Sequence, residues 1–318
     1  MNQVTDQQII EILKKEAVPA LGCTEPVACA LACAKCKEVL GGVPEHLDVL
    51  VSGNIYKNGM GVGIPGTGMV GLPIAAALGA VCGKSEYGLE VLKEVNVGDN
   101  LQRAKDMLSH VTVSLKMDAP DKLYAEALAT KGNDKVKVII AYAHTNIILV
   151  EKNGEELFKR EFKLDTAKEE DKVPELSVKR IWDFVHEVDV KDIEFVLQGA
   201  EMNKAISAEG LQSEYGLQIG KTLKENIDKG LLEDDLLNRT LIRATAASDA
   251  RMDGCPKPVM TNSGSGNQGI TVYLPVVVAA ETFGASREQL ARALALSNLI
   301  AVHIHHYMGH LSALCGIL

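Results

Sequence analysis

Hydrophobic positions recur along the chain with two different periods. An apolar face at helical spacing predicts a helix over residues 5–17. A second helix is predicted over 26–40, because Pro26 suits a first helical turn and Gly41-Gly42 ends the helix. The small residues of 72–80 indicate a third, tightly packed helix. Alternating or branched apolar residues predict strands over residues 46–52, 111–117, 122–128, 136–142 and 145–151. Asn153-Gly154 is typical of a two-residue hairpin turn, so the strands of this half should pair largely antiparallel.

The second half of the chain has helical periodicity almost throughout. Helices are predicted over 175–187, 192–212, 216–228, 233–250, 270–283 and 286–308. The charged stretch 165–174 predicts a linker. We therefore predict the α+β class, with an α+β domain over 1–168 that holds a mixed or antiparallel sheet, and a mainly helical domain over 169–318.

Composition and charge narrow the class of protein. Hydrophobic residues make up 47% of the 318 residues but aromatic residues only 4%, so the core must consist largely of Ala, Val, Ile and Leu. A net charge of −9 without a basic cluster argues against binding to nucleic acid. No apolar run reaches the roughly 18 residues of a membrane span, and the amphipathic N-terminus does not resemble a signal peptide. We expect a cytoplasmic protein.

Seven cysteines in a reducing compartment argue against a disulfide framework. Cys29, Cys33 and Cys36 have the C-x3-C-x2-C spacing of radical-enzyme clusters, but they fall in an Ala-rich helical pattern that favours a packed core. Cys23 precedes a helix, where the positive helix end favours a thiolate that could bind metal or act as a nucleophile. A buried loop cysteine, beside a Thr24 that only caps the helix, is the structural alternative.

Two loops are rich in glycine and small polar residues. Residues 53–71 contain GxGxxG, but Pro65 inside the motif argues against dinucleotide binding, and an anion site or a structural loop remains. Residues 253–269 gather hydroxyls, amides and glycines before a helix, which favours a site for an anionic or zwitterionic small molecule. Near the end of the chain, His303, His306 and His310 would share one helical face. They are candidate metal ligands, acid–base groups or ordinary core and surface histidines.

Four stretches together resemble the L-cysteine desulfidase family, which is similar to the α-chain of iron–sulfur L-serine dehydratases. They are GCTEP (22–26), SGNIYKNGMGVGIPGT (52–67), DGCPKPVMTNSGSGNQGI (253–270) and HHYMGHLSALCG (305–316). The resemblance implies a lyase that uses a 4Fe–4S cluster in amino-acid catabolism. L-cysteine would give pyruvate, ammonia and sulfide, and L-serine would give pyruvate and ammonia.

The resemblance also implies roles for individual residues. Cys23 and Cys315 would be cluster ligands, and Lys57, His306 and His310 are candidates for the base. The substrate would be held by Thr24, Asn54, Thr67, Asn262, Ser263, Gly264, Ser265 and Asn267.

Relatives continue beyond the position of Leu318, so we expect a third cluster ligand there and low activity, or none, for the chain as given. The alternative function is a non-catalytic protein that binds an amino acid or carboxylate and has lost the cluster. A small amino acid is the expected partner, with no nucleic acid or membrane, and the Ala- and Gly-rich helices would permit a homodimer.

Overall fold

The computed structural model describes residues 4–160 and 176–308, which form two compact units. The sheet unit comprises residues 21–169 and 253–256. The helical unit comprises residues 1–20, 170–252 and 257–318. In the described part of the chain, no helix has both the length and the apolar character needed to cross a membrane.

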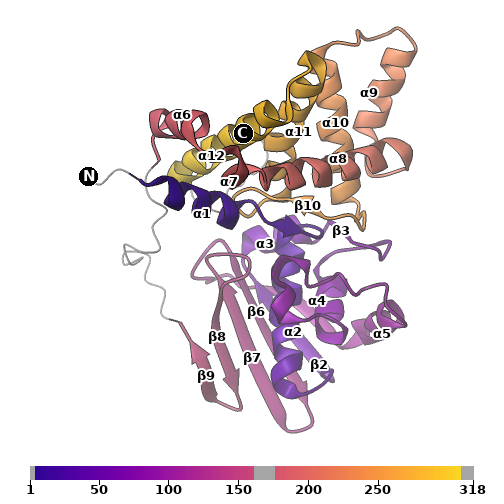
Figure 1. Ribbon diagram of the computed structural model, residues 1–318. Helices are drawn as coiled ribbons and strands as arrows, with labels where there is room; N and C mark the ends of the chain where they lie inside the picture. The colour runs from indigo at the N-terminus through magenta and orange to yellow at the C-terminus, as the bar shows by residue number, and fades with distance from the viewer. Residues whose placement is uncertain (1–3, 161–175, 309–318) are drawn as a thin grey trace. The chain divides into compact units, whose positions relative to one another are not determined.

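The sheet unit is built on six strands in the order β5-β2-β6-β7-β8-β9 (Figure 1). The strands are β2 (His46–Val51), β5 (Val111–Leu115), β6 (Tyr124–Lys131), β7 (Asp134–Ala141), β8 (Ile147–Lys152) and β9 (Glu155–Lys159). β2 and β5 pair in parallel and the other neighbours pair antiparallel, so the sheet is mixed and the predicted α+β class is confirmed. The β8–β9 turn lies at Asn153 and Gly154, whose φ angles of 55° and 88° are those of the predicted hairpin turn.

Helices pack on one face of this sheet. α2 (Thr24–Leu40) contacts β6 and β7, and α4 (Leu72–Val81) packs against α2. At Gly79 in α4 an added Cβ would lie 2.1 Å from the Ala30 carbonyl oxygen, so the two backbones can meet only because the side chains are small. This contact explains how a core with few aromatic residues is filled.

The sheet unit also contains shorter elements. They are α3 (Gly53–Gly59), β3 (Gly63–Ile64), β4 (Met69–Val70), α5 (Asn100–Met107) and the 3₁₀ turns Ser85–Glu90 and Leu108–His110. β3 and β4 form an antiparallel pair, not the strand–helix turn of a dinucleotide-binding motif, so the GxGxxG match has no such context.

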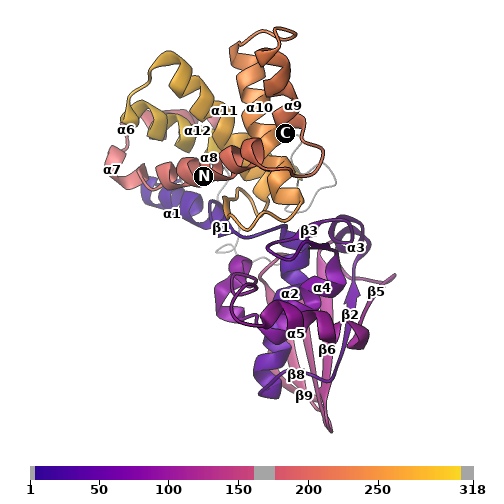
Figure 2. The same ribbon diagram turned by 90° about the vertical axis from the view of Figure 1, so that its right-hand side faces the viewer.

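The helical unit contains eight helices among its described residues. They are α1 (Asp6–Glu16), α6 (Val178–Glu187), α7 (Val190–Ile193), α8 (Val196–Gln212), α9 (Ile219–Asp228), α10 (Leu236–Met252), α11 (Gly266–Phe283) and α12 (Arg287–Met308). α8 and α10 lie side by side (Figure 2), and Gly210 permits this because a Cβ there would be 2.0 Å from the Ala246 carbonyl oxygen.

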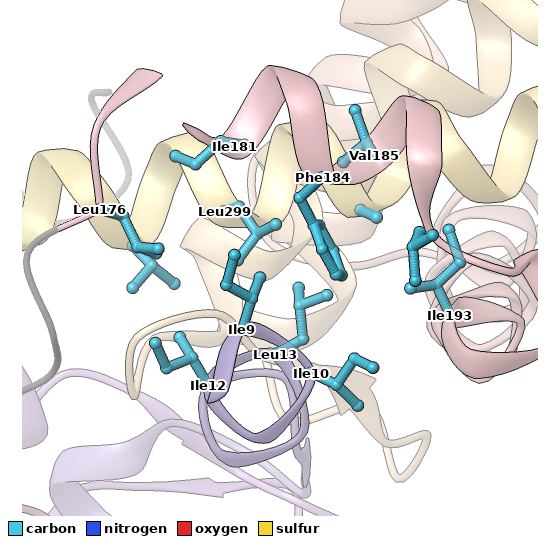
Figure 3. Packing of buried hydrophobic residues seen from close by; sticks show 13 residues of the cluster. Ile9, Ile10, Ile12, Leu13, Leu176, Ile181, Phe184, Val185, Ile193 and Leu299 are labelled. Carbon is cyan, nitrogen blue, oxygen red and sulfur yellow. The ribbon is translucent and has the colours of Figure 1, made fainter. Parts of the chain in front are cut away.

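α1 packs against helices that are distant from it in the sequence. Its buried face, Ile9, Ile10, Ile12 and Leu13, packs with Phe184 of α6 and with residues of α12 such as Leu299 (Figure 3). The short strands β1 (Pro19–Ala20) and β10 (Val259–Met260) then pair antiparallel. This pairing holds residues 259–260 beside the segment that follows α1.

Candidate functional site

Two clusters of polar side chains stand out, one in each unit. The thiol cluster lies in the sheet unit and consists of Cys23, Glu25, Asn58 and His144. The α11 loop lies in the helical unit and consists of residues 259–269. Each is described within its own unit.

Cys23 is the N-cap residue of α2 and is 8% exposed. Its Sγ donates a hydrogen bond to Glu25 Oε2 at 2.9 Å. The expectation that Thr24 is the N-cap is wrong, because Thr24 is already helical and its hydroxyl donates to the same Glu25 oxygen at 3.3 Å. The positive end of α2 favours an anion at this thiol, as metal binding requires.

Glu25 is a buried carboxylate with several donors around it. Its Oε1 accepts a hydrogen bond from Asn58 Nδ2 at 3.1 Å. Burial raises the pKa of Glu25, but the charge of His144 and the bonds from Cys23 and Asn58 outweigh this effect and hold the pKa below its ordinary value of 4.5. The structure therefore places an ionised carboxylate directly beside the Cys23 thiol.

Three further predicted site residues belong to the sheet unit. Asn54 lines an open cavity of about 390 Å³ together with Lys116 and Lys122. Lys57 is exposed on α3. Thr67 closes the β3–β4 turn, donating to the Ile64 carbonyl oxygen at 2.7 Å and accepting from the Met69 amide at 2.9 Å, so its hydroxyl has a structural use.

Cys29, Cys33 and Cys36 lie inside α2 and are fully buried. Burial raises the pKa of Cys29 to about 12 and raises that of Cys33 well above its ordinary value. Cys36 Sγ donates to the Ala127 carbonyl oxygen of β6 at 3.5 Å. These contacts are those of packed core thiols and argue against the radical-enzyme interpretation.

The α11 loop contains a tight hairpin turn. Asn262 and Ser265 exchange backbone hydrogen bonds of 3.1 and 2.9 Å, and the central residues Ser263 and Gly264 have φ angles of 48° and 77°. Ser265 then caps α11, its Oγ accepting from the Gln268 amide at 3.2 Å. All five of the predicted loop residues, Asn262, Ser263, Gly264, Ser265 and Asn267, therefore lie at or beside the start of this helix.

Buried amides hold the loop in place. Asn203 bonds to both backbone groups of Met260, and Asn262 Nδ2 donates to Asn298 Oδ1 at 3.0 Å. The Thr261 amide donates to the Val18 carbonyl oxygen at 2.9 Å. Such buried networks rigidify a loop when their members are satisfied, so the loop is pre-organised.

Arg251 lies against the first turn of α11 and is 3% exposed. Its Nη1 donates to Asn267 Oδ1 at 2.9 Å, and a Cβ on Gly266 would come within 2.3 Å of its Nε. A guanidinium at the positive end of an 18-residue helix creates a strongly anion-attracting environment. The loop thus offers a cation, backbone donors and small polar groups in one place.

The predicted residues near the chain end are only partly described. His306 is exposed on α12 and its ring contacts the Tyr307 ring edge-on at 5.3 Å. His310 and Cys315 lie outside the described residues. Within the described ranges, no three His, Cys, Asp or Glu side chains are close enough to hold a metal ion.

Sequence reasoning missed several members of these clusters. Glu25, Asn58 and His144 were not singled out, although Glu25 lies inside the GCTEP stretch. Arg251 was not singled out either, and Gln268 was noted only as part of the loop segment. The signal that was available for Gln268 is the S-x-x-Q spacing of a helix cap.

Comparison with known proteins places the chain in a family. The model of the serine dehydratase alpha chain matches residues 86–318. The chain belongs to the serine dehydratase alpha chain family. The suspected resemblance to this α-chain is thereby confirmed.

Relatives named UPF0597 proteins are similar over nearly the whole chain. A UPF0597 protein of Actinobacillus pleuropneumoniae serotype 3 is 49% identical over 98% of this chain and 72% of its own length. A UPF0597 protein of Aeromonas hydrophila is 48% identical over 96% of this chain and 70% of its own length. The serine dehydratase alpha chain match covers the whole α11 loop.

Proposed function

We propose that the chain is a lyase that catalyses β-elimination from a small L-amino acid. L-serine would give pyruvate and ammonia, and L-cysteine would give pyruvate, ammonia and sulfide. The observation that carries this proposal is the α11 loop, where Arg251, Asn267 and the helix N-terminus converge inside the matched region. A non-catalytic amino-acid binder is the alternative outcome.

The α11 loop suits the carboxylate of such a substrate. The first backbone N–H groups of a helix have no partner within the helix and point toward an anion. The Arg251 guanidinium lies against the same turn and can donate to two carboxylate oxygens. Because Asn203 and Asn298 anchor the loop, these donors need little reorganisation when the substrate binds.

We further propose that Cys23 and Cys315 hold a 4Fe–4S cluster. Cys23 fits one ligand position because its nearly buried thiol lies at the N-terminus of α2, whose positive end favours the thiolate that a cluster iron binds. When bound, such a cluster supplies a Lewis acid that polarises the departing thiol or hydroxyl group. Cys29, Cys33 and Cys36 have no part in this proposal.

The elimination also needs a base for the α-proton. Lys57, His306 and His310 are the candidates, and substitution separates them. A variant that lacks the base keeps amino-acid binding and loses turnover. A variant that lacks only a surface side chain keeps both.

The experiment is anaerobic reconstitution with iron and sulfide of wild type, Cys23→Ala and Cys33→Ala, followed by iron and sulfide analysis and by titration with L-serine and L-cysteine. We expect wild type and Cys33→Ala to bind the cluster and Cys23→Ala to lose it. We also expect either amino acid to perturb its visible absorption. Equal iron in all three proteins, or amino-acid binding without any effect on the cluster, would overturn the proposal and favour the binder.

A further inference from the structure

Three helices among the described residues begin with the same local pattern, a Ser or Thr cap followed three positions later by Gln. α1 starts with Thr5-x-x-Gln8, α12 with Ser286-x-x-Gln289 and α11 with Ser265-x-x-Gln268. α12 forms the complete pattern, since Ser286 N also donates to Gln289 Oε1 at 2.8 Å. In a capping box of this kind the hydroxyl accepts from the backbone of the third helical residue, and the glutamine side chain reaches back to the backbone N–H of the cap. α1 makes both bonds, with Thr5 N donating to Gln8 Oε1 at 2.9 Å.

In α11 only half of the box is formed. The Gln268 amide donates to Ser265 Oγ, as expected. The Ser265 amide, however, donates to the Asn262 carbonyl oxygen at 2.9 Å and closes the hairpin turn. The Ser265 N–H, which Gln268 Oε1 would bind in a complete capping box, is therefore already used by the hairpin turn.

Gln268 Oε1 is left buried without a hydrogen-bond partner among the described residues. The whole residue is only 2% exposed. A buried carbonyl oxygen without a donor is unfavourable, so a fold retains one only where something else compensates. Gln268 is the third residue of α11, so this buried oxygen belongs to a side chain of the first turn of the helix.

The neighbouring groups indicate which donor fits. The Arg251 guanidinium and the first N–H groups of α11 attract a carboxylate at this helix end. An acceptor without a donor among the described residues, on the same first turn of α11, suits a ligand that carries a positive donor next to its carboxylate. An α-amino acid has both groups on one carbon atom.

We propose that Gln268 Oε1 accepts a hydrogen bond from the α-ammonium group of the substrate, and that Gln268 thereby makes the site specific for α-amino acids. This inference rests on the proposed function, because it assigns the substrate carboxylate to the α11 loop. Gln268 is a specificity-determining residue. A carboxylic acid that lacks the ammonium group leaves the buried oxygen unpaired and binds weakly.

The test compares L-serine with 3-hydroxypropanoate, which lacks only the ammonium group, by calorimetric titration of wild type and Gln268→Met. Wild type should prefer L-serine by about 100-fold or more. Gln268→Met, of similar size but without the amide, should shrink this preference to a few-fold by weakening L-serine alone. Gln268→Glu keeps an acceptor oxygen and should keep the preference, which covers the case in which Gln268→Met folds poorly.

Gln8→Met is the matched control, since it removes the glutamine of a complete box. Gln8→Met should lower the melting temperature and leave the ligand preference unchanged. Gln268→Met should not lower the melting temperature, because the amide oxygen that it removes makes no hydrogen bond within the described residues. Loss of stability in Gln268→Met with an unchanged preference would show a structural role and overturn the inference. If wild type binds neither compound, the proposed function itself fails.

Discussion

Asn203 pairs with Met260 as a neighbouring strand would. The Met260 amide donates to Asn203 Oδ1 at 2.9 Å, and Asn203 Nδ2 donates to the Met260 carbonyl oxygen at 3.3 Å. Asn203 is fully buried on α8. One side chain thus satisfies both backbone polar groups of a residue at the start of the α11 loop.

Asn203→Ala should lower the free energy of unfolding by about 1–3 kcal/mol, because it leaves the two backbone groups of Met260 buried without these bonds. Urea unfolding measures the change. Glu201→Ala, on the exposed side of the same helix, is the control and should change stability by less than about 0.5 kcal/mol. A value for Asn203→Ala no larger than that of the control would contradict the anchoring role.

Gly269→Ala should disturb the α11 loop directly. The added Cβ would lie 1.9 Å from the Met260 carbonyl oxygen, so β10 and the helix must separate. We expect a loss of about 1–3 kcal/mol in stability and weaker binding of L-serine. Gly61→Ala is the matched control, because nothing lies within 4 Å of a Cβ there, and its binding should equal that of wild type. Tight binding by Gly269→Ala would show that the loop contributes little.

Glu25 should make stability depend on acid pH. Its folded pKa is lowered from 4.5, so the ionised form contributes stability that is present above pH 4.5 and is lost as the pH falls through the lower folded pKa. Glu25→Gln should therefore unfold with a flatter pH dependence between about pH 5 and about pH 3 than wild type. Urea unfolding across this range measures it, and parallel curves for the two proteins would refute the ionised carboxylate.

The cysteines inside α2 should not react with alkylating reagents in the folded protein. With a pKa of about 12, Cys29 has a thiolate fraction of about 10⁻⁴ at pH 8, and it is fully buried. We expect iodoacetamide to leave Cys29 and Cys33 unmodified in folded protein and to label both in denaturant, as mass spectrometry of peptides would show. Rapid labelling of Cys33 in folded protein would mean that α2 opens.

Most elements could be predicted because local signals and burial agree. Alternation over 46–52 and 136–142 matches the inward face of β2 and β7, and Gly41 ends α2 in the left-handed conformation, as the sequence indicated. β9 escaped prediction because it is an edge strand with all five residues exposed, so it has no buried face to produce a pattern. α3 escaped because two glycines weaken its helical signal, and only the Ser52 cap reveals it.

The sequence predicted which residues belong to the site more readily than it predicted the contacts between them. The small polar residues of the α11 loop indicated a ligand site because such residues are seldom gathered without a use. The burial of Arg251 and the half-formed box at Gln268 could not be read from the sequence, since both depend on how the turn at 262–265 uses its backbone donors. The packing of α1 with α6 and α12 depends likewise on contacts more than 160 residues apart.

The most direct test of the central claim is pyruvate release by anaerobically reconstituted protein supplied separately with L-serine and L-cysteine. We expect iron-dependent release of pyruvate from at least one of the two amino acids, and none from the Cys23→Ala variant. Absence of pyruvate from a protein with a full cluster, or equal release by wild type and Cys23→Ala, would contradict it.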